Sequence, residues 1–254
     1  MNKKIYILAF IVFIVAVAMY YLITNKKEVT TPIIDQTSED VVAPKTQIDF
    51  GIPKKSAHYE TNTPSHGQTL AGVPINIVID FNFDLADNST ISITKGGKEY
   101  GIGSIVIDSN KLSMRREIDP FAPDGAYVVN YVACWPDRSC HDGNFKFAID
   151  RSLREGFVDM KGQKEVMLTV KDFSFNPRDI IVSPGTLITW VNEDEAVHYV
   201  NTDSHPAHTY YLLQNSLGIK RGDSFSVSFD KAGIYPYHCS AHASVMRGNI
   251  LVEE

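Results

Sequence analysis

Near its C-terminus the chain reads Tyr237-His238-Cys239-Ser240-Ala241-His242-Ala243-Ser244-Val245-Met246-Arg247-Gly248. This stretch brings together a thiolate on Cys239, an imidazole on His242 and a thioether on Met246. Ligands of this soft kind select copper or zinc over magnesium or calcium, and two His, one Cys and a weak axial Met make the ligand set of a blue-copper site. The stretch supplies one of the two histidines. The candidate for the other is His198, in Trp190-Val191-Asn192-Glu193-Asp194-Glu195-Ala196-Val197-His198.

Further motifs upstream of this loop point to a known family. They are Phe175-Asn176-Pro177, Ser183-Pro184-Gly185-Thr186 before a strand over 187–191, Asn192-x-Asp194-x-x-x-His198, Arg221-Gly222-Asp223-Ser224-Phe225 and Ala232-Gly233-Ile234-Tyr235-Pro236-Tyr237. With these motifs, residues 164–254 resemble the cupredoxins, the family of plastocyanin, amicyanin, pseudoazurin and azurin. The Cys-to-His spacing resembles that of plastocyanin, and the His-x-x-x-Met-x-Gly ending is closer to azurin. The fold implied by the resemblance is a Greek-key β-sandwich.

The resemblance also implies a ligand set and an activity. Carried over residue by residue, the copper ligands fall on His198, Cys239, His242 and Met246, which gives one type 1 copper per chain. The implied activity is one-electron transfer with small or membrane-bound redox proteins. We expect no enzyme, since the implied site has no open position for a substrate and no positioned general base. Two alternatives remain: zinc in the same ligands, or Cys239 as a small buried hydrophobe.

The N-terminus has the features of a membrane segment. Residues 5–24 carry no charge, and this length suffices for a helix to span a bilayer. Lys3 and Lys4 precede the segment and favour a cytoplasmic N-terminus. We therefore expect a transmembrane signal-anchor over residues 1–25 and a flexible, charged, proline-containing linker over 26–55. The alternative is a cleaved signal peptide, but the small-x-small site that would end it does not follow.

Residues 56–152 are expected to form another β-sandwich. Strand-like runs at 75–81, 89–94, 104–107, 125–135 and 144–150 are separated by clusters of Gly, Asn, Asp and Pro. Several stretches resemble the CopC-type copper-resistance domain, an immunoglobulin-like sandwich. They are Ala57-His58-Tyr59, Thr63-Pro64-Ser65-His66-Gly67-Gln68-Thr69-Leu70, residues 77–82, Asp124-Gly125-Ala126-Tyr127-Val128-Val129 and Asp142-Gly143-Asn144-Phe145-Lys146-Phe147.

The resemblance to CopC raises the question of a copper site in this middle domain. That family binds Cu(II) through an N-terminal His and a later Asp-x-His. Here the amine of His58 is an amide, and no Asp-x-His occurs near His141. His58, His141 and either Asp137 or Asp142 leave a weak site open, although we favour surface polar residues on a spacer domain. The domain still suggests copper storage, delivery or resistance as the alternative to electron transfer.

The three cysteines of the chain are consistent with one disulfide and one ligand. Cys134 and Cys140 lie six residues apart, across a predicted turn, and a disulfide between them would close a small loop. Cys239 then stays single, as a copper thiolate must. A disulfide favours an oxidising compartment. We therefore expect the β domains on the extracytoplasmic side of the cell membrane, periplasmic or extracellular.

Three other histidines lie near the predicted copper ligands in the sequence. His205 and His208 either form a second metal site or decorate a loop over the copper. His238 precedes Cys239, and because neighbours on a strand point to opposite faces, His238 should face away from the copper. Multicopper oxidases and nitrite reductases use such a His for a second copper. The oxidases also need a His directly after the Cys and paired His-x-His motifs, but Ser240 follows Cys239 and no His-x-His occurs.

Length and composition set the remaining bounds. With 254 residues the chain is long enough for two modest domains with cores of their own. Aromatic and β-branched residues are common, and no long amphipathic helical stripe appears after residue 25. The predicted fold class is therefore all-β: an immunoglobulin-like and a cupredoxin sandwich behind one transmembrane helix. The net charge is −6 and no basic cluster is visible, so we expect no nucleic-acid partner.

Overall fold

The computed structural model describes residues 48–254, which form one compact unit. The predicted transmembrane segment at 1–25 lies outside the described residues, as does the predicted linker up to residue 47. Within the described part of the chain, no helix combines the length and the apolar character needed to cross a bilayer.

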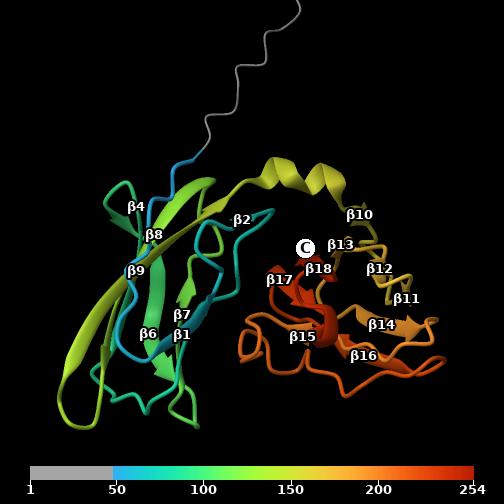
Figure 1. Ribbon diagram of the computed structural model, residues 1–254. Helices are drawn as coiled ribbons and strands as arrows, with labels where there is room; N and C mark the ends of the chain where they lie inside the picture. Colours follow the sequence, from blue (N-terminus) through green and yellow to red (C-terminus); the bar gives the residue numbers. More distant parts are fainter. Residues whose placement is uncertain (1–47) are drawn as a thin grey trace, which may run out of the picture. The chain divides into compact units, whose positions relative to one another are not determined.

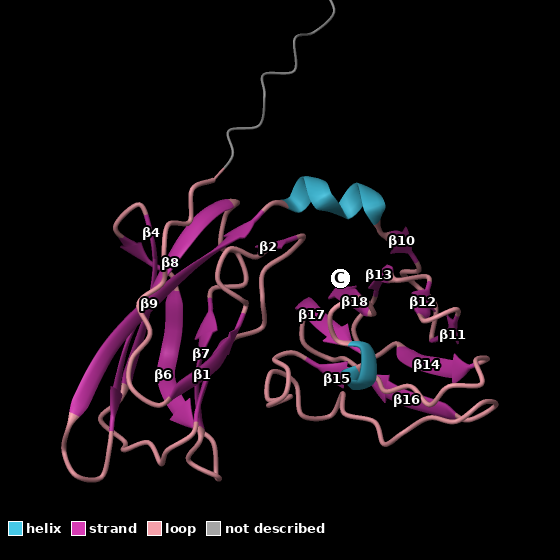
Figure 2. Ribbon diagram, viewed as in Figure 1, coloured by secondary structure: helices cyan, strands magenta, loops and turns pink. Residues whose placement is uncertain are grey.

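The regular secondary structure of the described chain is almost entirely β-strand (Figures 1 and 2). Two short 3₁₀ helices interrupt them, η1 (Arg151–Gly156) and η2 (Ser240–His242). Asp150 caps η1, because its side chain accepts a hydrogen bond from the amide of Ser152 and so satisfies a free donor at the helix start. The predicted all-β class is confirmed for residues 48–254.

The first sandwich has two sheets, with strand orders β1-β3-β7-β6 and β2-β9-β8-β4-β5. Its strands are β1 (Tyr59–Thr63), β2 (Thr69–Leu70), β3 (Ile77–Phe81), β4 (Thr90–Lys95), β5 (Lys98–Glu99), β6 (Gly101–Ile107), β7 (Ser113–Ile118), β8 (Gly125–Cys134) and β9 (Cys140–Ile149). The long antiparallel pair of β8 and β9 ends where Cys134 lies opposite Cys140. These two residues form the predicted disulfide, which links the two strands at the turn of the hairpin.

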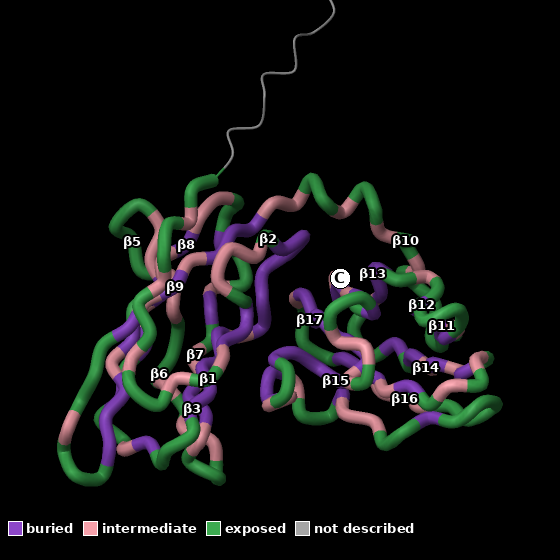
Figure 3. The backbone as a smooth tube through the Cα atoms, in the orientation of Figure 1, coloured by how far each residue is buried: buried purple, intermediate pink, exposed green. Residues whose placement is uncertain are grey.

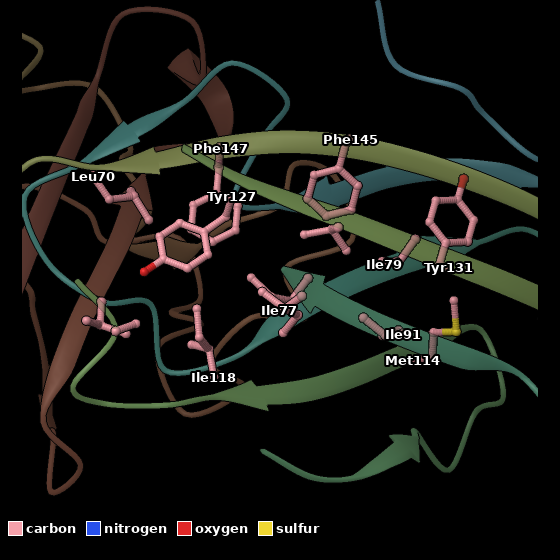
Figure 4. Close-up of a cluster of buried hydrophobic side chains, with 14 of the residues drawn as sticks. Leu70, Ile77, Ile79, Ile91, Met114, Ile118, Tyr127, Tyr131, Phe145 and Phe147 are labelled. Carbon is pink, nitrogen blue, oxygen red and sulfur yellow. The ribbon is translucent and has the colours of Figure 1, made fainter. Parts of the chain in front are cut away.

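One hydrophobic core joins these two sheets (Figure 4). Side chains alternate along a strand, so every second residue of β8 points inward, among them Tyr127 and Tyr131. Tyr127 stacks on Phe147 of the neighbouring strand, with ring centroids 5.2 Å apart. From the facing sheet, Ile77 and Ile79 of β3 join the same core. The alternation along β8 therefore turns one face of its sheet toward the core.

The second sandwich has sheets with strand orders β10-β13-β18-β17-β15 and β12-β11-β14-β16. Its strands are β10 (Val158–Asp159), β11 (Glu165–Lys171), β12 (Ser174–Asn176), β13 (Asp179–Val182), β14 (Leu187–Asn192), β15 (Asn201–Thr202), β16 (Ser224–Ser228), β17 (Gly233–His238) and β18 (Arg247–Val252). Trp190 of β14 and Tyr237 of β17 meet across its core, with ring centroids 5.4 Å apart. This contact joins the two strands that lead into the predicted ligand loops.

The two sandwiches share buried surface along β3. This strand is buried at every position (Figure 3). Its two faces contribute to different cores, since Ile77 and Ile79 belong to the first and Val78 to the second. Such two-sided burial explains why the run lacks polar alternation and reads as continuously apolar up to Asp80.

Candidate metal centre

Three of the four predicted ligands converge just beyond β14 and β17. Cys239 directly follows β17, His242 ends η2, and His198 lies between β14 and β15. The Cys239 Sγ atom is 3.6 Å from Nδ1 of His198 and 3.5 Å from Nδ1 of His242. In tetrahedral geometry, bonds of about 2.3 Å to sulfur and 2.0–2.1 Å to nitrogen place the two ligand atoms roughly 3.6 Å apart. The three atoms are therefore spaced to bind one metal ion.

Met246 is tied to this set through the backbone of the loop. The amide of Cys239 donates to the carbonyl of Met246, and the amide of Met246 donates to the carbonyl of His242, each at 2.9 Å. The Met246 side chain is buried in the same hydrophobic cluster as Cys239. The loop is thus a closed turn that carries three of the predicted ligands. The axial role of Met246 stays a prediction.

Gly248 lets β18 return close to β17 after this turn. A Cβ atom at this position would lie 2.5 Å from the carbonyl oxygen of Arg178 and 2.6 Å from the ring of Tyr237. Tyr237 is buried, and its hydroxyl donates to that same carbonyl at 3.2 Å. Any residue larger than glycine would push the backbone that closes the ligand loop out of place.

Asp194 orients His198. The Nε2 atom of His198 donates to the Asp194 carboxylate at 2.9 Å, which leaves Nδ1 free to face Cys239. The same carboxylate accepts hydrogen bonds from the amides of Asp172 at 2.8 Å and Phe173 at 3.0 Å. Burial raises the pKa of Asp194, but the hydrogen bonds from these amides and from His198 together lower the pKa below its usual value. Asp194 is therefore held as a charged acceptor.

The surroundings of the three ligands are mostly dry. Cys239 and His198 have no exposed surface, whereas His242 is half-buried. The amide of Tyr199 donates to Cys239 Sγ at 3.4 Å. The ring of Phe173 meets the rings of His198 and His242 edge-on, with centroids 5.4 Å and 4.9 Å apart. Of the three ligands, His242 is the one that reaches the surface.

A second group of converging donor atoms is formed by His205, His208 and His238. The ring of His238 contacts the other two, while the neighbouring Cys239 contacts His198 and His242. The two residues thus point to opposite sides, as strand alternation predicts. Over residues 48–254, these two groups are the ones in which three or more His, Cys, Asp or Glu side chains bring their ligand atoms together.

The polar residues singled out in the middle domain belong to neither group. His58 shares a hydrogen bond of 3.1 Å with Asn82 and stacks on Phe83. Asp142 forms an ion pair of 2.6 Å with Lys54. These contacts engage His58 and Asp142 in separate local interactions.

Three features of the centre leave little trace in the sequence: the Asp194 carboxylate as a partner of His198, the Phe173 ring and the Tyr199 amide. Asp194 appears in the sequence motif only as a fixed residue four positions before His198. Phe173 comes from a separate hairpin, where Asp172 and Phe173 have φ values of 50° and 55°. A backbone amide and a ring from a distant turn leave no pattern around the ligands that could have revealed them.

Comparison with known proteins agrees with this geometry. Residues 163–253 match the model of the copper-binding proteins of the plastocyanin/azurin family, and residues 59–150 match that of the CopC domain. Plastocyanin of Scenedesmus fuscus is 32% identical over 84 residues, which are 31% of this chain and 86% of that protein. Amicyanin of Paracoccus denitrificans is 26% identical over 88 residues, which are 35% of this chain and 65% of that protein.

A solved structure, the purple cupredoxin from Nitrosopumilus maritimus, aligns with a TM-score of 0.31 and 24% identity, covering 35% of this chain and 99% of that one. The matched C-terminal segment contains both ligand loops. One thiolate and two imidazoles at these distances suit copper. Through residues 163–253, this chain belongs to the plastocyanin/azurin family of copper-binding proteins.

Proposed function

We propose that this protein is a membrane-anchored one-electron carrier that works on the extracytoplasmic face of the membrane. The observation that carries the proposal is the convergence of Cys239 with His198 and His242 in a closed frame. Bound copper supplies the redox chemistry, by changing between Cu(I) and Cu(II). The chain's own task is to keep the ligand atoms in one geometry.

Two of the ligands are held by partners outside the metal set, and the backbone of the ligand loop closes on itself. Asp194 fixes the ring of His198, the amide of Tyr199 bonds to the thiolate, and the Cys239–Met246 backbone pairing closes the loop. Ligands locked in this way need little rearrangement when the charge of the centre changes. A preformed frame suits electron transfer better than metal release, which calls for exposed and exchangeable ligands.

Apolar side chains near His242 support exchange with a redox partner. Phe173, which contacts its ring, is 51% exposed, and Val245, three residues after η2, is 77% exposed. Val197, next to His198 in the chain, is 41% exposed. Exposed apolar groups around a half-buried ligand suit brief docking of small or membrane-bound redox proteins.

Copper storage, delivery or resistance is the second candidate function. The match of residues 59–150 to the CopC domain favours it. The two candidates differ in what leaves the protein. A carrier exchanges electrons and keeps its copper, whereas a delivery protein passes copper to an acceptor.

The absorption spectrum of the oxidised, copper-loaded protein tests the centre. Charge transfer from the Cys239 thiolate to Cu(II) should give an intense colour, and Cys239→Ser should abolish it. His141→Ala is the matched control, because His141 is exposed and belongs to neither group of converging ligand atoms. A colourless oxidised copper protein with Cys239 intact would refute the type 1 assignment. Ready copper transfer to an apo-acceptor, with negligible electron exchange, would replace the carrier by the delivery role.

Membrane fractionation tests the anchor. The full chain should stay with membranes after a high-salt wash, because insertion of about twenty apolar residues is effectively irreversible. A variant without residues 5–24 should move to the soluble fraction. If the mature protein begins near residue 25 and is soluble, residues 5–24 act as a cleaved signal instead.

A further inference from the structure

His205, His208 and His238 bring three imidazole nitrogens to one point, on the side of β17 away from Cys239. The Nε2 atom of His238 is 3.2 Å from Nε2 of His208 and 3.3 Å from Nδ1 of His205. Two tetrahedral bonds of about 2.0–2.1 Å, as in metal–histidine sites, place their nitrogens roughly 3.3–3.4 Å apart. The observed spacing is therefore that of ligands sharing one ion.

A buried carboxylate fixes the tautomer and the ring direction of His238. Asp203 is 3% exposed and accepts a hydrogen bond of 2.9 Å from Nδ1 of His238. Arg247 donates to both oxygens of Asp203, at 2.7 Å and 2.6 Å. With its proton on Nδ1, His238 directs the lone pair of Nε2 at the other two rings. A carboxylate behind a metal-binding His is the usual arrangement that fixes the tautomer and the ring direction.

Hydrogen bonds alone account poorly for this cluster. The single lone pair on Nε2 of His238 faces two other ring nitrogens at nearly equal distances, and one such acceptor makes one well-aligned bond. Ser240 offers His208 a further polar contact at 3.0 Å.

We propose that His205, His208 and His238 form a second metal site, which binds Cu²⁺ with its three imidazole nitrogens. Imidazole suits both copper and zinc, and the order of divalent affinities places Cu²⁺ above Zn²⁺. Three protein ligands leave a fourth position for water or another small ligand. His205 is exposed, so an ion can enter from solvent, while His238 is fully buried and fixes the site to the sheet.

This site is separate from the first, although one strand bears both. His238 and Cys239 are consecutive, and their side chains contact different histidines. Loss of the second ion should therefore leave the first centre bound and coloured. The proposal does not depend on whether the protein is an electron carrier, because it concerns Cu²⁺ bound by imidazoles alone.

Copper stoichiometry of the full-length, untagged protein in detergent tests the proposal. We expect two tightly held copper ions in the wild type and one in His205→Ala, with the intense colour unchanged. The EPR spectrum should show a second Cu(II) signal, with nitrogen couplings, that His205→Ala removes. His208→Ala, which truncates another of the three ligands, should lower affinity for the second ion by at least about 100-fold.

His141→Ala is the control for adventitious copper at an exposed histidine, and it should keep both ions. One copper per wild-type chain in the presence of excess Cu²⁺ would overturn the proposal. Equal loss of the second copper in His141→Ala and His205→Ala would overturn it as well, since it would show non-specific surface binding. Zn²⁺ displacing the second Cu²⁺ at equal concentrations would overturn the assignment to copper.

Discussion

At the scale of single residues, Asp194 orients the predicted ligand His198 without being a ligand itself. Asp194→Ala removes the acceptor for Nε2 of His198 and leaves the amides of Asp172 and Phe173 without their partner. We expect copper affinity to fall about 10–100-fold, the usual effect of losing such an orienting group. Competition with a copper chelator measures the change. Glu195→Ala, on the same loop but 82% exposed on its side chain, should match the wild type. Equal affinities for both variants would show that Asp194 does not orient the site.

Met246 should act on the potential more than on the fold. As a weak axial donor it would stabilise Cu(II), so Met246→Leu, which keeps a buried apolar side chain, should raise the reduction potential. We expect a shift on the order of 60 mV, a tenfold change in a one-electron equilibrium. Protein-film voltammetry measures it, and Val245→Leu, at an exposed neighbour, is the control. An unchanged potential in Met246→Leu would remove Met246 from the ligand set.

At the scale of secondary-structure elements, the disulfide fixes the turn of the β8–β9 hairpin. Closing so short a loop restricts the unfolded chain by an amount worth about 2 kcal/mol. The double variant Cys134→Ala/Cys140→Ala should lose that much stability in urea unfolding and keep its colour. Adding reductant to the copper-free wild type should lower its stability by the same amount. The stability of the double variant should not change with reductant. Loss of colour in the double variant would mean that the hairpin shapes the distant metal centre.

The hydrophobic pattern predicts many of the strands, but the agreement between predicted and observed bounds differs from strand to strand. The predicted run 187–191 corresponds to β14 (Leu187–Asn192), and 125–135 to β8 (Gly125–Cys134). β9 begins at Cys140, four residues before the predicted 144, because its first residues are exposed and polar and lack the apolar signal. β7 (Ser113–Ile118) was missed, since Arg115 and Arg116 interrupt its apolar pattern. Their partners explain the charges: Arg115 pairs with Asp108, and Arg116 donates to the carbonyl of Ile91.

The first metal centre was largely predictable because its ligands lie in short motifs with fixed spacing. The second histidine group was only partly so. The sequence marks His205 and His208 as a pair that either binds a metal or decorates a loop, and strand alternation places His238 on the face away from Cys239. Only the folded loop after β15 brings His205 and His208 over β17, and no local sequence rule specifies that approach.

At the scale of the whole described molecule, Asp80 links the two sandwiches. It lies on β3 in the first and accepts hydrogen bonds, each of 2.7 Å, from Ser204 and Thr209 of the second and from Ser113. Asp80→Ala leaves these buried hydroxyls without their acceptor and should cost about 1–3 kcal/mol of stability. Urea unfolding of the copper-free protein measures this, with the exposed Asp84→Ala as control. A loss no larger than that of the control would show that the link contributes nothing.

The pH dependence of Asp80 has a definite sign. Burial raises the pKa of Asp80 above its usual value, although the three hydroxyls and Arg115 act in the opposite direction. A raised carboxyl pKa in the fold gives stability below the ordinary pKa of about 4, which is lost as pH rises through the folded-state pKa. With rising pH, copper-free wild type should therefore lose stability relative to Asp80→Asn, which cannot ionise. A parallel pH dependence of the two proteins would contradict the raised pKa.

Burial of Cys239 has a consequence for the order in which the protein matures. Its thiol has no exposed surface, whereas exchange between thiols and disulfides requires one sulfur to reach another. Once folded, the single free thiol cannot attack the Cys134–Cys140 bond or join a second molecule. The chain can therefore fold and oxidise first and receive its metal afterwards. In the folded, copper-free protein, Cys239 is therefore protected from forming a wrong disulfide.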